Sequence, residues 1–384
     1  MDPYKVTYLL GAGASYHSIP VVNTLNERMK LFLEMFFDES LPNPDGKRPI
    51  NILHLNRTEY YKEHEDCIDF LKSFRPVFYE AIQHRTIDTY ARKLYLRNED
   101  KKLNDLKRFL ALYFAFEQSE DKQKIITNSY SFKISGKDPL THKDKVNHIN
   151  TVLDYRYDVF FASLLDKELK LPENVNIISW NYDHQLEMGY QNYSDKSIHQ
   201  CQERLGVFPR EGAKNGKVIK LNGSAHQYYD INKETFLFDR AKDNIYKSIL
   251  ASFSDEILKN REFALNFAWE KGANQLRAIE LAEGILSSTD ELVIIGYSFP
   301  YFNRDVDIKL LMKTLNSVKR IKVMVHPNDF ESVKQSIEDI TGEDSRAVVP
   351  ELHNDLDQFY IPSKFFGNPD IIESVLTVKD LGIL

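Results

Sequence analysis

The sequence predicts an α/β protein with an open parallel sheet and a large α-helical insertion, and three observations carry this prediction. Short apolar runs rich in β-branched residues recur along the chain, each ends in a polar or glycine-containing turn, and helix-like sequence follows. A continuously apolar run of this kind is typical of a strand buried on both faces of a parallel sheet. Ligands of such sheets bind at the carboxyl ends of the strands, so the turns are the places to search for function.

The first expected strand, Lys5 to Leu10, is followed by a helical pattern. Apolar side chains recur there at intervals of three and four residues and so share one helical face: Val22, Leu25, Met29, Phe32 and Phe36. Four further strands are expected from similar apolar runs: Val175 to Ser179, Val218 to Leu221, Glu291 to Ile295 and Arg320 to His326. Strands that alternate with helices in this way form a Rossmann-like sheet with helices on both faces.

Residues 41–170 differ in character from the rest. They begin with the turn-rich segment LPNPDGKRP and continue with helix formers and aromatics, as in LNDLKRFLALYFAFE. We predict that 41–170 is an α-helical insertion or cap over the sheet, and that a second helical stretch runs from Ala241 to Ser287. On this division residues 1–40 and 171–345 form the sheet domain, and 346–384 form a C-terminal extension.

Composition and charge exclude several classes of function. The 57 acidic residues outnumber the 50 basic ones and give a net charge of -7, so direct binding to nucleic acid or anionic lipid is not expected. The two cysteines, Cys67 and Cys201, lack the spacing of a zinc site or a disulfide framework, and no metal is expected. Since the chain has no apolar run near the ~18 residues of a membrane span and no signal-peptide pattern, we expect a cytoplasmic protein.

The turn after the first strand has the sequence Gly11-Ala12-Gly13-Ala14-Ser15. Glycines there let the main chain turn sharply and approach a pyrophosphate, while a helix N-terminus offers free N–H groups. Ser15 adds a hydroxyl donor or caps the helix. The pattern favours a nucleotide-binding turn; the alternative is a tight turn without a ligand. A third glycine, which a dehydrogenase fingerprint requires, is missing.

Polar residues also follow the second strand, in the segment Ser179-Trp180-Asn181-Tyr182-Asp183. The Asn181 amide and the Asp183 carboxylate are two residues apart and suit the hydroxyls of a ribose and a carboxamide. In the alternative interpretation, Asp183 caps the helix that follows and Asn181 supports a turn.

Three further strand ends carry candidate residues. Asn222 and Gly223 follow the third strand, and His226 lies shortly after them. A histidine in such a place is more often structural than catalytic. Gly296 and Ser298 follow the fourth strand, in the segment GYSFP, where an ordinary strand-to-helix turn would have the same sequence. Asn328 follows the fifth strand, where it is either a ligand residue or the N-cap of the next helix.

Taken together, the succession GAGAS, WNYD, NGS and GYS, each after a strand, resembles the sirtuin family. It looks most like the bacterial sirtuin-like domains of anti-phage defence, such as the NAD-cleaving effector of Thoeris systems and the sirtuin-like partners of HerA ATPases and short Argonautes. The abortive-infection protein AbiH has a similar succession. The resemblance covers residues 4 to 37 and 172 to 330.

The resemblance implies a set of NAD-binding residues that are divided among the turns. Those of the first turn would hold the pyrophosphate: Gly11, Ala12, Gly13 and Ser15. Asn181 and Asp183 would face the nicotinamide ribose and the carboxamide. Gly296 and Ser298 would line the opposite side of the nucleotide, and Asn328 would face its adenosine end. The protein deacetylases of the family also carry a four-cysteine zinc ribbon, for which this chain has too few cysteines. Cleavage of NAD to nicotinamide and ADP-ribose is therefore favoured over deacetylation.

One position departs from the family pattern. Where the family has His-Gly, this chain has Asn222-Gly223, and an asparagine cannot act as a general base. In one interpretation the bond to nicotinamide breaks through an oxocarbenium-like state and Asn222 only hydrogen-bonds the ribose. In a second, His226 or His17 replaces the missing base. In a third, the site binds NAD or ADP-ribose without cleaving it.

We therefore expect an NAD glycohydrolase of bacterial anti-phage defence, working as a homo-oligomer or with a partner such as a HerA-type ATPase. The alternative is a catalytically impaired NAD or ADP-ribose sensor, or an assembly subunit of a defence complex. A nuclease is not favoured, because the chain has no recognisable acidic metal cluster or basic face.

Overall fold

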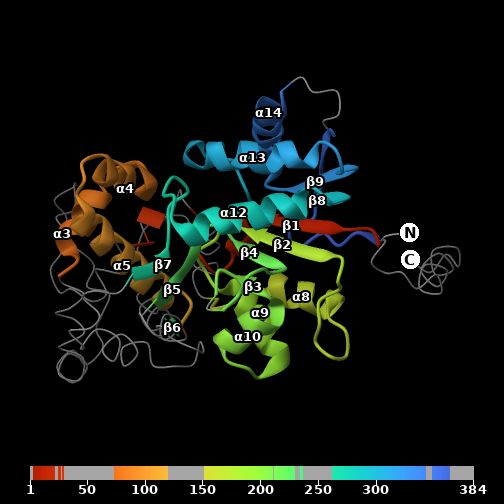
Figure 1. Ribbon diagram of the computed structural model, residues 1–384, viewed down its shortest axis with the longest axis horizontal. Helices are drawn as coiled ribbons and strands as arrows, with labels where there is room; N and C mark the ends of the chain where they lie inside the picture. Colours follow the sequence, from red (N-terminus) through yellow and green to blue (C-terminus); the bar gives the residue numbers. More distant parts are fainter. Residues whose placement is uncertain are drawn as a thin grey trace, which may run out of the picture.

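The computed structural model describes most of the chain outside four long segments (Figure 1). The described residues are 3–21, 25, 26, 28, 29, 73–119, 151–210, 212–229, 234–236, 262–342 and 348–363. The C-terminal extension predicted at 346–384 is therefore described only from 348 to 363, and residues 41–72 and 120–150 of the predicted insertion lie outside the described residues.

The central layer is a sheet of seven strands in which every neighbouring pair is parallel. In spatial order the strands are β10 (Pro350–Leu352), β9 (Arg320–Met324), β8 (Glu291–Ile295), β1 (Val6–Leu10), β2 (Val175–Ser179), β4 (Val218–Lys220) and β3 (Val207–Phe208). All five strands expected from the sequence are present, so the prediction of an α/β, Rossmann-like parallel sheet is confirmed. The sequence did not predict β3 and β10, which are short strands at the two edges.

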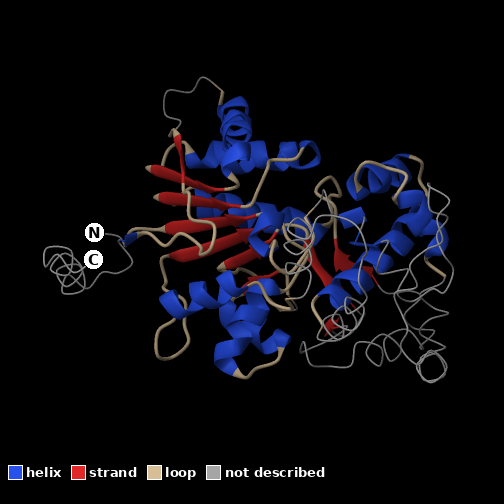
Figure 2. Cartoon of the chain, turned by 180° about the vertical axis from the view of Figure 1, so that it is seen from behind, coloured by secondary structure: helices blue, strands red, loops and turns tan. Residues whose placement is uncertain are grey.

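Helices cover both faces of this sheet (Figures 1 and 2). One face carries α8 (Tyr155–Leu164), α9 (Gln185–Ser194) and α10 (Ile198–Leu205), and the other carries α12 (Ala273–Leu286), α13 (Arg304–Thr314) and α14 (Phe330–Thr341). Alternate residues of β1 point to opposite faces: Leu9 packs with the second group of helices, and Tyr8 and Leu10 pack with the first. All five residues of β1 are buried, as a strand covered on both faces requires.

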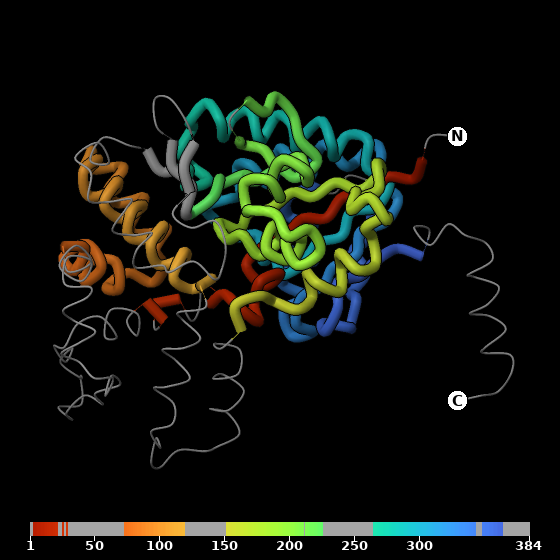
Figure 3. Tube along the Cα trace, turned by 90° about the horizontal axis from the view of Figure 1, so that it is seen from below, coloured from red at the N-terminus to blue at the C-terminus, as the bar shows by residue number. Residues whose placement is uncertain are grey.

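A separate group of elements, which we call the cap, lies beyond the carboxyl ends of the parallel strands (Figures 1 and 3). It consists of α3 (Arg75–Ala81), α4 (Ile87–Leu96) and α5 (Asp100–Glu117) with an antiparallel sheet of β6 (Glu234–Phe236), β5 (Gly223–Tyr229) and β7 (Glu262–Leu265). The chain passes from the end of β4 into β5 within two residues, which fixes the small sheet at this edge. Ala225, Leu265 and Phe267 pack with α5 in one apolar core.

Two features of the structure differ from the sequence-based division of the chain. The helix α8 lies within the segment 41–170, yet Tyr157, Phe160 and Phe161 pack with β1 and β2 in the core of the parallel sheet. The helical stretch expected from Ala241 to Ser287 contains strand β7 before α12 begins. The prediction of continuous helix was wrong there, because pairing with β5 determines the conformation of these residues.

Within the described ranges, three short 3-10 helices follow strands at the carboxyl edge of the parallel sheet. They are η1 (Ala12–Ser15), η3 (Tyr301–Asn303) and η4 (Pro327–Asp329). Of the helices in the described part of the chain, none combines the length and the apolar character needed to cross a bilayer.

Candidate functional site

The turns singled out in the sequence meet at one edge of the parallel sheet. Strand β1 lies between β8 and β2, so the chain order reverses around it and the turns after these three strands are neighbours. In open α/β sheets this reversal is where ligands bind. The cap lies over the same edge (Figure 1).

The glycines of the first turn pack against the turn after β8. Gly11 N–H donates to Ile295 O at 2.9 Å, and Gly13 N–H donates to Gly296 O at 2.9 Å. Gly296 has φ +60, and a Cβ added to it would lie 2.3 Å from the Cα and carbonyl carbon of Gly13. The packing of two main chains therefore explains these glycines without a ligand. The N–H groups of Gly11 and Gly13 both donate to carbonyls of the chain itself, at Ile295 and Gly296. Ala12, between them, is exposed.

A buried arginine that the sequence analysis missed holds the other side of the first turn. Arg156 Nη2 donates to the carbonyls of Gly13 and Ala14 at 2.9 and 3.1 Å. The same Nη2 lies 2.6 Å from Asp154 Oδ2, which also accepts from the main-chain N–H of His17 at 3.0 Å. The turn is thus held between Gly296 on one side and Arg156 on the other.

The structure brings three of the predicted site residues together. Ser15 is fully buried, Asn181 is 8% exposed and Asp183 is 6% exposed. Asn181 Nδ2 donates to Ser15 Oγ at 3.3 Å, and Ser15 Oγ lies 3.2 Å from the hydroxyl of Tyr157 on α8. Ser15 also hydrogen-bonds Asp183. We call Ser15, Tyr157, Asn181 and Asp183 the polar cluster; it joins the turns after β1 and β2.

Asp183 has an unusual protonation equilibrium. Burial raises its pKa to about 6, against the opposing effects of the Lys220 charge and of hydrogen bonds from the Gln185 N–H and from Ser15. Its Oδ1 accepts from the N–H of Gln185, the first residue of α9, at 3.1 Å. Asp183 therefore belongs to the polar cluster and hydrogen-bonds the first N–H of α9, but the alternative in which it is the N-cap is wrong, because the N-cap of α9 is His184. For Asn181, the side chain reaches Ser15, while its main-chain N–H donates to Ser179 Oγ at 3.1 Å.

A buried charged network, which the sequence analysis also missed, contacts the polar cluster at Asp183. Lys220, the last residue of β4, donates from Nζ to the carbonyl of Asp183 at 2.6 Å and lies 2.8 Å from Glu187 Oε1. His184 Nδ1 lies 3.1 Å from the same Glu187 oxygen. Burial and the Lys220 charge lower the pKa of His184 to about 4. Burial alone would raise the pKa of Glu187, but the charge of Lys220 holds it well below its usual range.

Asn222, which stands where the resemblance expects a histidine, is 5% exposed. Its main-chain carbonyl accepts from Asn266 N–H at 2.9 Å, and its side chain hydrogen-bonds the buried phenol of Tyr182. Its Oδ1 is buried and has no hydrogen-bond partner among the described residues. Asn222 and Tyr182 follow adjacent strands, since Ser179 and Lys220 are in register. A buried oxygen without a partner can accept a hydrogen bond from a ligand hydroxyl, and Tyr182, which Asn222 contacts, lies between Asn181 and Asp183 in the sequence.

The two histidines considered as replacement bases lie in different surroundings. His226 belongs to β5, which leads away from the sheet into the cap, and its side chain lies outside what the structure describes. His17 is partly exposed, and its ring centroid is 4.9 Å from that of Tyr155.

The remaining predicted residues lie on the β8 and β9 side of the edge. Ser298 and Asn328 are exposed, and the main-chain N–H of Asn328 donates to His326 Nδ1 at 3.3 Å. The alternative in which Asn328 is the N-cap of the next helix is wrong, because α14 has Asp329 as its N-cap.

A second buried polar group lies beneath the turn after β8. The hydroxyl of Tyr297 donates to Asp307 at 2.8 Å, and Asn303 Nδ2 donates to the Tyr297 hydroxyl at 3.0 Å. Burial raises the pKa of Asp307 to about 8. The Tyr297 ring stacks on Trp180 of the WNYD segment at 5.9 Å between centroids, which connects the turns after β8 and β2.

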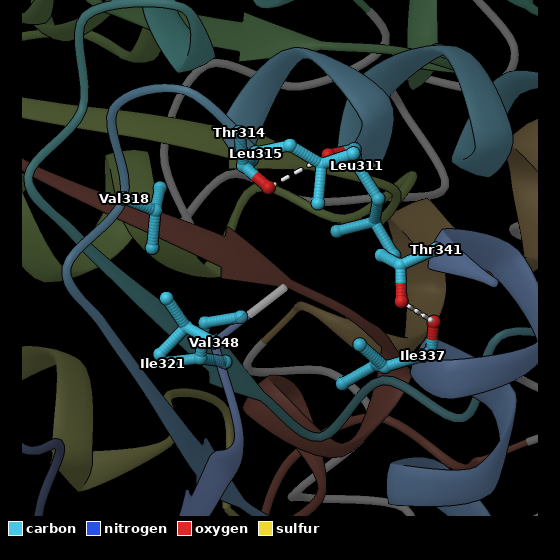
Figure 4. A pocket seen from close by; sticks show the side chains of 8 residues that line it. All are labelled: Leu311, Thr314, Leu315, Val318, Ile321, Ile337, Thr341 and Val348. Atoms are coloured by element: carbon cyan, nitrogen blue, oxygen red, sulfur yellow. Dashed lines mark hydrogen bonds between the residues drawn. The ribbon is translucent and has the colours of Figure 1, made fainter. Parts of the chain in front are cut away.

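A small pocket elsewhere in the sheet domain does not have the character of a functional site (Figure 4). Residues of α13, β9 and α14 and of the chain before β10 line it: Leu311, Thr314, Leu315, Val318, Ile321, Ile337, Thr341 and Val348. Its two hydroxyls donate to carbonyls of their own helices, Thr314 to Leu311 and Thr341 to Ile337. The lining therefore offers a ligand little but apolar contact.

Within the described ranges, no group of three or more His, Cys, Asp or Glu side chains could hold a metal ion. No protein-family model matches this chain, and no curated protein matches it at a significant level. The site must therefore be interpreted from its own geometry.

Proposed function

We propose that this edge of the sheet binds NAD and hydrolyses it to nicotinamide and ADP-ribose. The observation that carries the proposal is the polar cluster: Asn181 and Asp183 lie together with Ser15 at the carboxyl ends of β1 and β2, under a cap. An amide and a carboxyl at this place suit a ribose and a carboxamide. The resemblance to sirtuin-like domains gives the same assignment.

In the proposed reaction a water molecule attacks C1′ of the nicotinamide ribose. The bond from C1′ to the ring nitrogen breaks, and its electron pair neutralises the positive charge of the nicotinamide ring. Asp183 accepts a proton from the water, because a carboxyl with a pKa of about 6 is a competent base near neutral pH. Asn181 orients the water, and the unpaired Asn222 Oδ1 accepts from a ribose hydroxyl. The products are nicotinamide, ADP-ribose and one proton.

The phosphates would lie on the exposed side of the first turn. Since the N–H groups of Gly11 and Gly13 are already hydrogen-bonded, we assign the phosphates to the exposed main chain at Ala12 and the exposed hydroxyl of Ser298. Asn328, exposed after β9, would contact the adenosine end.

The test is NAD turnover, followed by chromatography of nicotinamide and ADP-ribose, with binding measured by calorimetry. Asp183→Asn is expected to lower kcat by about a hundredfold or more, since general-base catalysis contributes roughly 10²–10⁴. Asn181→Ala should also lower kcat, and Asn192→Ala, an exposed asparagine on α9, serves as the control. The rate should rise with pH through about 6 as Asp183 ionises. Absence of both binding and turnover would refute the assignment.

A second candidate function is an NAD or ADP-ribose sensor, and Asn222 favours it because an asparagine cannot serve as a base. Such a protein would bind the nucleotide tightly without releasing nicotinamide. In either case we propose a role in bacterial anti-phage defence in the cytoplasm, as a homo-oligomer or with a HerA-type ATPase. Light scattering after size-exclusion chromatography, with and without NAD, tests whether the nucleotide changes the assembly.

A further inference from the structure

We infer that Lys220 is a positioning residue of the candidate site: its buried ammonium group holds the main chain at Asp183 and so sets where the Asp183 carboxyl lies. The inference rests on the proposed function of the polar cluster. The hydrolysis scheme makes no use of Lys220.

The burial of Lys220 is the first argument. Its side chain is 2% exposed, and lysines are almost never this buried unless they are paired. Its Nζ donates to Asp183 O at 2.6 Å and pairs with Glu187 Oε1 at 2.8 Å. Removing a buried ion pair is often neutral for stability, so stability alone does not explain why the pair is present.

The position of Lys220 is the second argument. Lys220 ends β4 and is in register with Ser179, the last residue of β2. Its side chain therefore reaches across the edge of the sheet to the segment that follows the neighbouring strand.

Further contacts hold the same segment from other elements. Gln118, at the end of α5 in the cap, accepts from the main-chain N–H of His184 at 2.6 Å. Gln202 on α10 donates to Glu187 Oε1 at 3.1 Å. The residues from 183 to 187 are thus anchored to β4, to α10 and to the cap, which is the support that a catalytic side chain on a loop requires.

The charge of Lys220 also affects the pH–rate profile, which a purely structural residue would leave unchanged. The groups that face Asp183 are Lys220 on β4, Glu187 on α9, Tyr157 on α8 and Ser15 on η1. Among them the Lys220 charge has the largest effect in lowering the pKa of Asp183, and Glu187 acts more weakly in the opposite direction. Loss of both charges should therefore move the acid limb of the pH–rate profile to higher pH.

The variant that tests this is Lys220→Met combined with Glu187→Gln. Lys220→Met alone would leave an uncompensated carboxylate in the interior and could prevent folding, whereas the double variant removes both charges and keeps both volumes. Its matched control is Lys322→Met with Glu351→Gln, which removes the ion pair between β9 and β10 by the same substitutions.

Two measurements are made on each protein. Amide hydrogen exchange is expected to accelerate in peptides covering residues 180–185 of the Lys220/Glu187 variant and to stay unchanged in the control. The pH profile of NAD cleavage is expected to show a kcat lower by about ten- to a hundredfold with little change in KM, as mispositioning of a catalytic group produces, and an acid limb at higher pH.

Unchanged exchange together with an unchanged pH profile would overturn the inference. If the wild-type protein does not cleave NAD, the proposed function fails, and the exchange measurement alone decides the inference. Faster exchange at 180–185 then still establishes that Lys220 holds this segment, and unchanged exchange rejects it.

Discussion

The turns on the two sides of β1 are held in different ways. On the β8 side, Gly296 meets Gly13 through main-chain contacts, at distances that exclude any Cβ. On the β2 side, Asn181 and Asp183 are held by hydrogen bonds from side chains and by a lysine from the next strand. The first junction is made by main-chain atoms, with the Tyr297–Asp307 pair buried beneath it, whereas the second places Asp183, Lys220 and Glu187 in one buried network.

The two sides of this edge of the sheet therefore suit different roles. Main-chain packing on the β8 side fixes the shape of the edge and leaves Ser298 exposed to a ligand. Burial raises the pKa of a carboxyl on both sides, but Asp183 on the β2 side directly follows a strand end and belongs to the polar cluster, whereas Asp307 on the β8 side lies on α13 beneath the turn. Under the proposed function, the nucleotide would be recognised on the first side and would react on the second.

The most damaging change to the β8 junction should be Gly296→Ala. A Cβ at this position would lie 2.3 Å from the Gly13 main chain, and φ is +60. Overpacking and a left-handed backbone together predict a loss of about 4 kcal/mol in the free energy of unfolding, measured by urea denaturation. Gly284→Ala is the control, because its Cβ meets nothing within 4 Å on the exposed face of α12. It should gain about 0.5–1 kcal/mol; equal losses in both variants would contradict the packing argument.

Replacement of Arg156, which holds the other side of the first turn, should cause the next largest loss of stability. Arg156→Met leaves the buried carboxylate of Asp154 without its cation and should cost about 3 kcal/mol. Arg277→Met, which breaks an exposed ion pair with Glu280, should change stability by less than about 1 kcal/mol. A loss for Arg156→Met no greater than that of the control would mean that the β1 turn is held without the arginine.

The buried carboxyl beneath the β8 junction predicts a pH dependence. Because its pKa is about 8 in the folded protein and near 4 in the unfolded chain, the folded state holds the proton more tightly. Stability should therefore fall as pH rises from about 4 to about 8, by about 2 kcal/mol or more between pH 5 and pH 8. Asp307→Asn should lose this part of the slope in denaturation curves measured across that range. Parallel slopes in the two proteins would show that Asp307 ionises normally.

The smallest changes in stability are expected for Ser15 and Ser298, one buried in the polar cluster and one exposed after β8. Ser15→Ala removes a buried hydroxyl between Tyr157 and Asn181 and should cost about 1–2 kcal/mol of stability. Ser298→Ala changes an exposed side chain and should alter stability by less than about 0.5 kcal/mol. Calorimetry should instead show weaker NAD binding for Ser298→Ala, and unchanged affinity would remove Ser298 from the ligand site.

The sequence predicted the central strands because burial on both faces leaves a continuous apolar run, as in β1 and β8. It missed β3, with two residues, and β10, with three, because such short edge strands lack a pattern. It also assigned helix to residues that form β7, where pairing with β5 decides the conformation.

The candidate site was predictable in part for a related reason. Parallel strands bring their carboxyl ends to one edge, so residues that directly follow strands, such as Asn181 and Ser15, could be grouped from the sequence. Arg156 and Lys220 could not, since their roles depend on hydrogen bonds to carbonyls of residues far away in the chain. A lysine at a strand end and a glutamate on a helix, such as Glu187, have the same local sequence whether they are exposed or buried.

The central position of β1 also has a consequence for biosynthesis. Val6 pairs with Val175 on one side and with Glu291 on the other, so β1 acquires its second neighbour some 285 residues after it is made. At roughly 5–20 residues per second, the apolar β1 segment waits about 15 to 60 seconds for that neighbour. During that interval the apolar β1 segment lacks one of the two strands that bury it, which is the kind of exposed surface that favours aggregation.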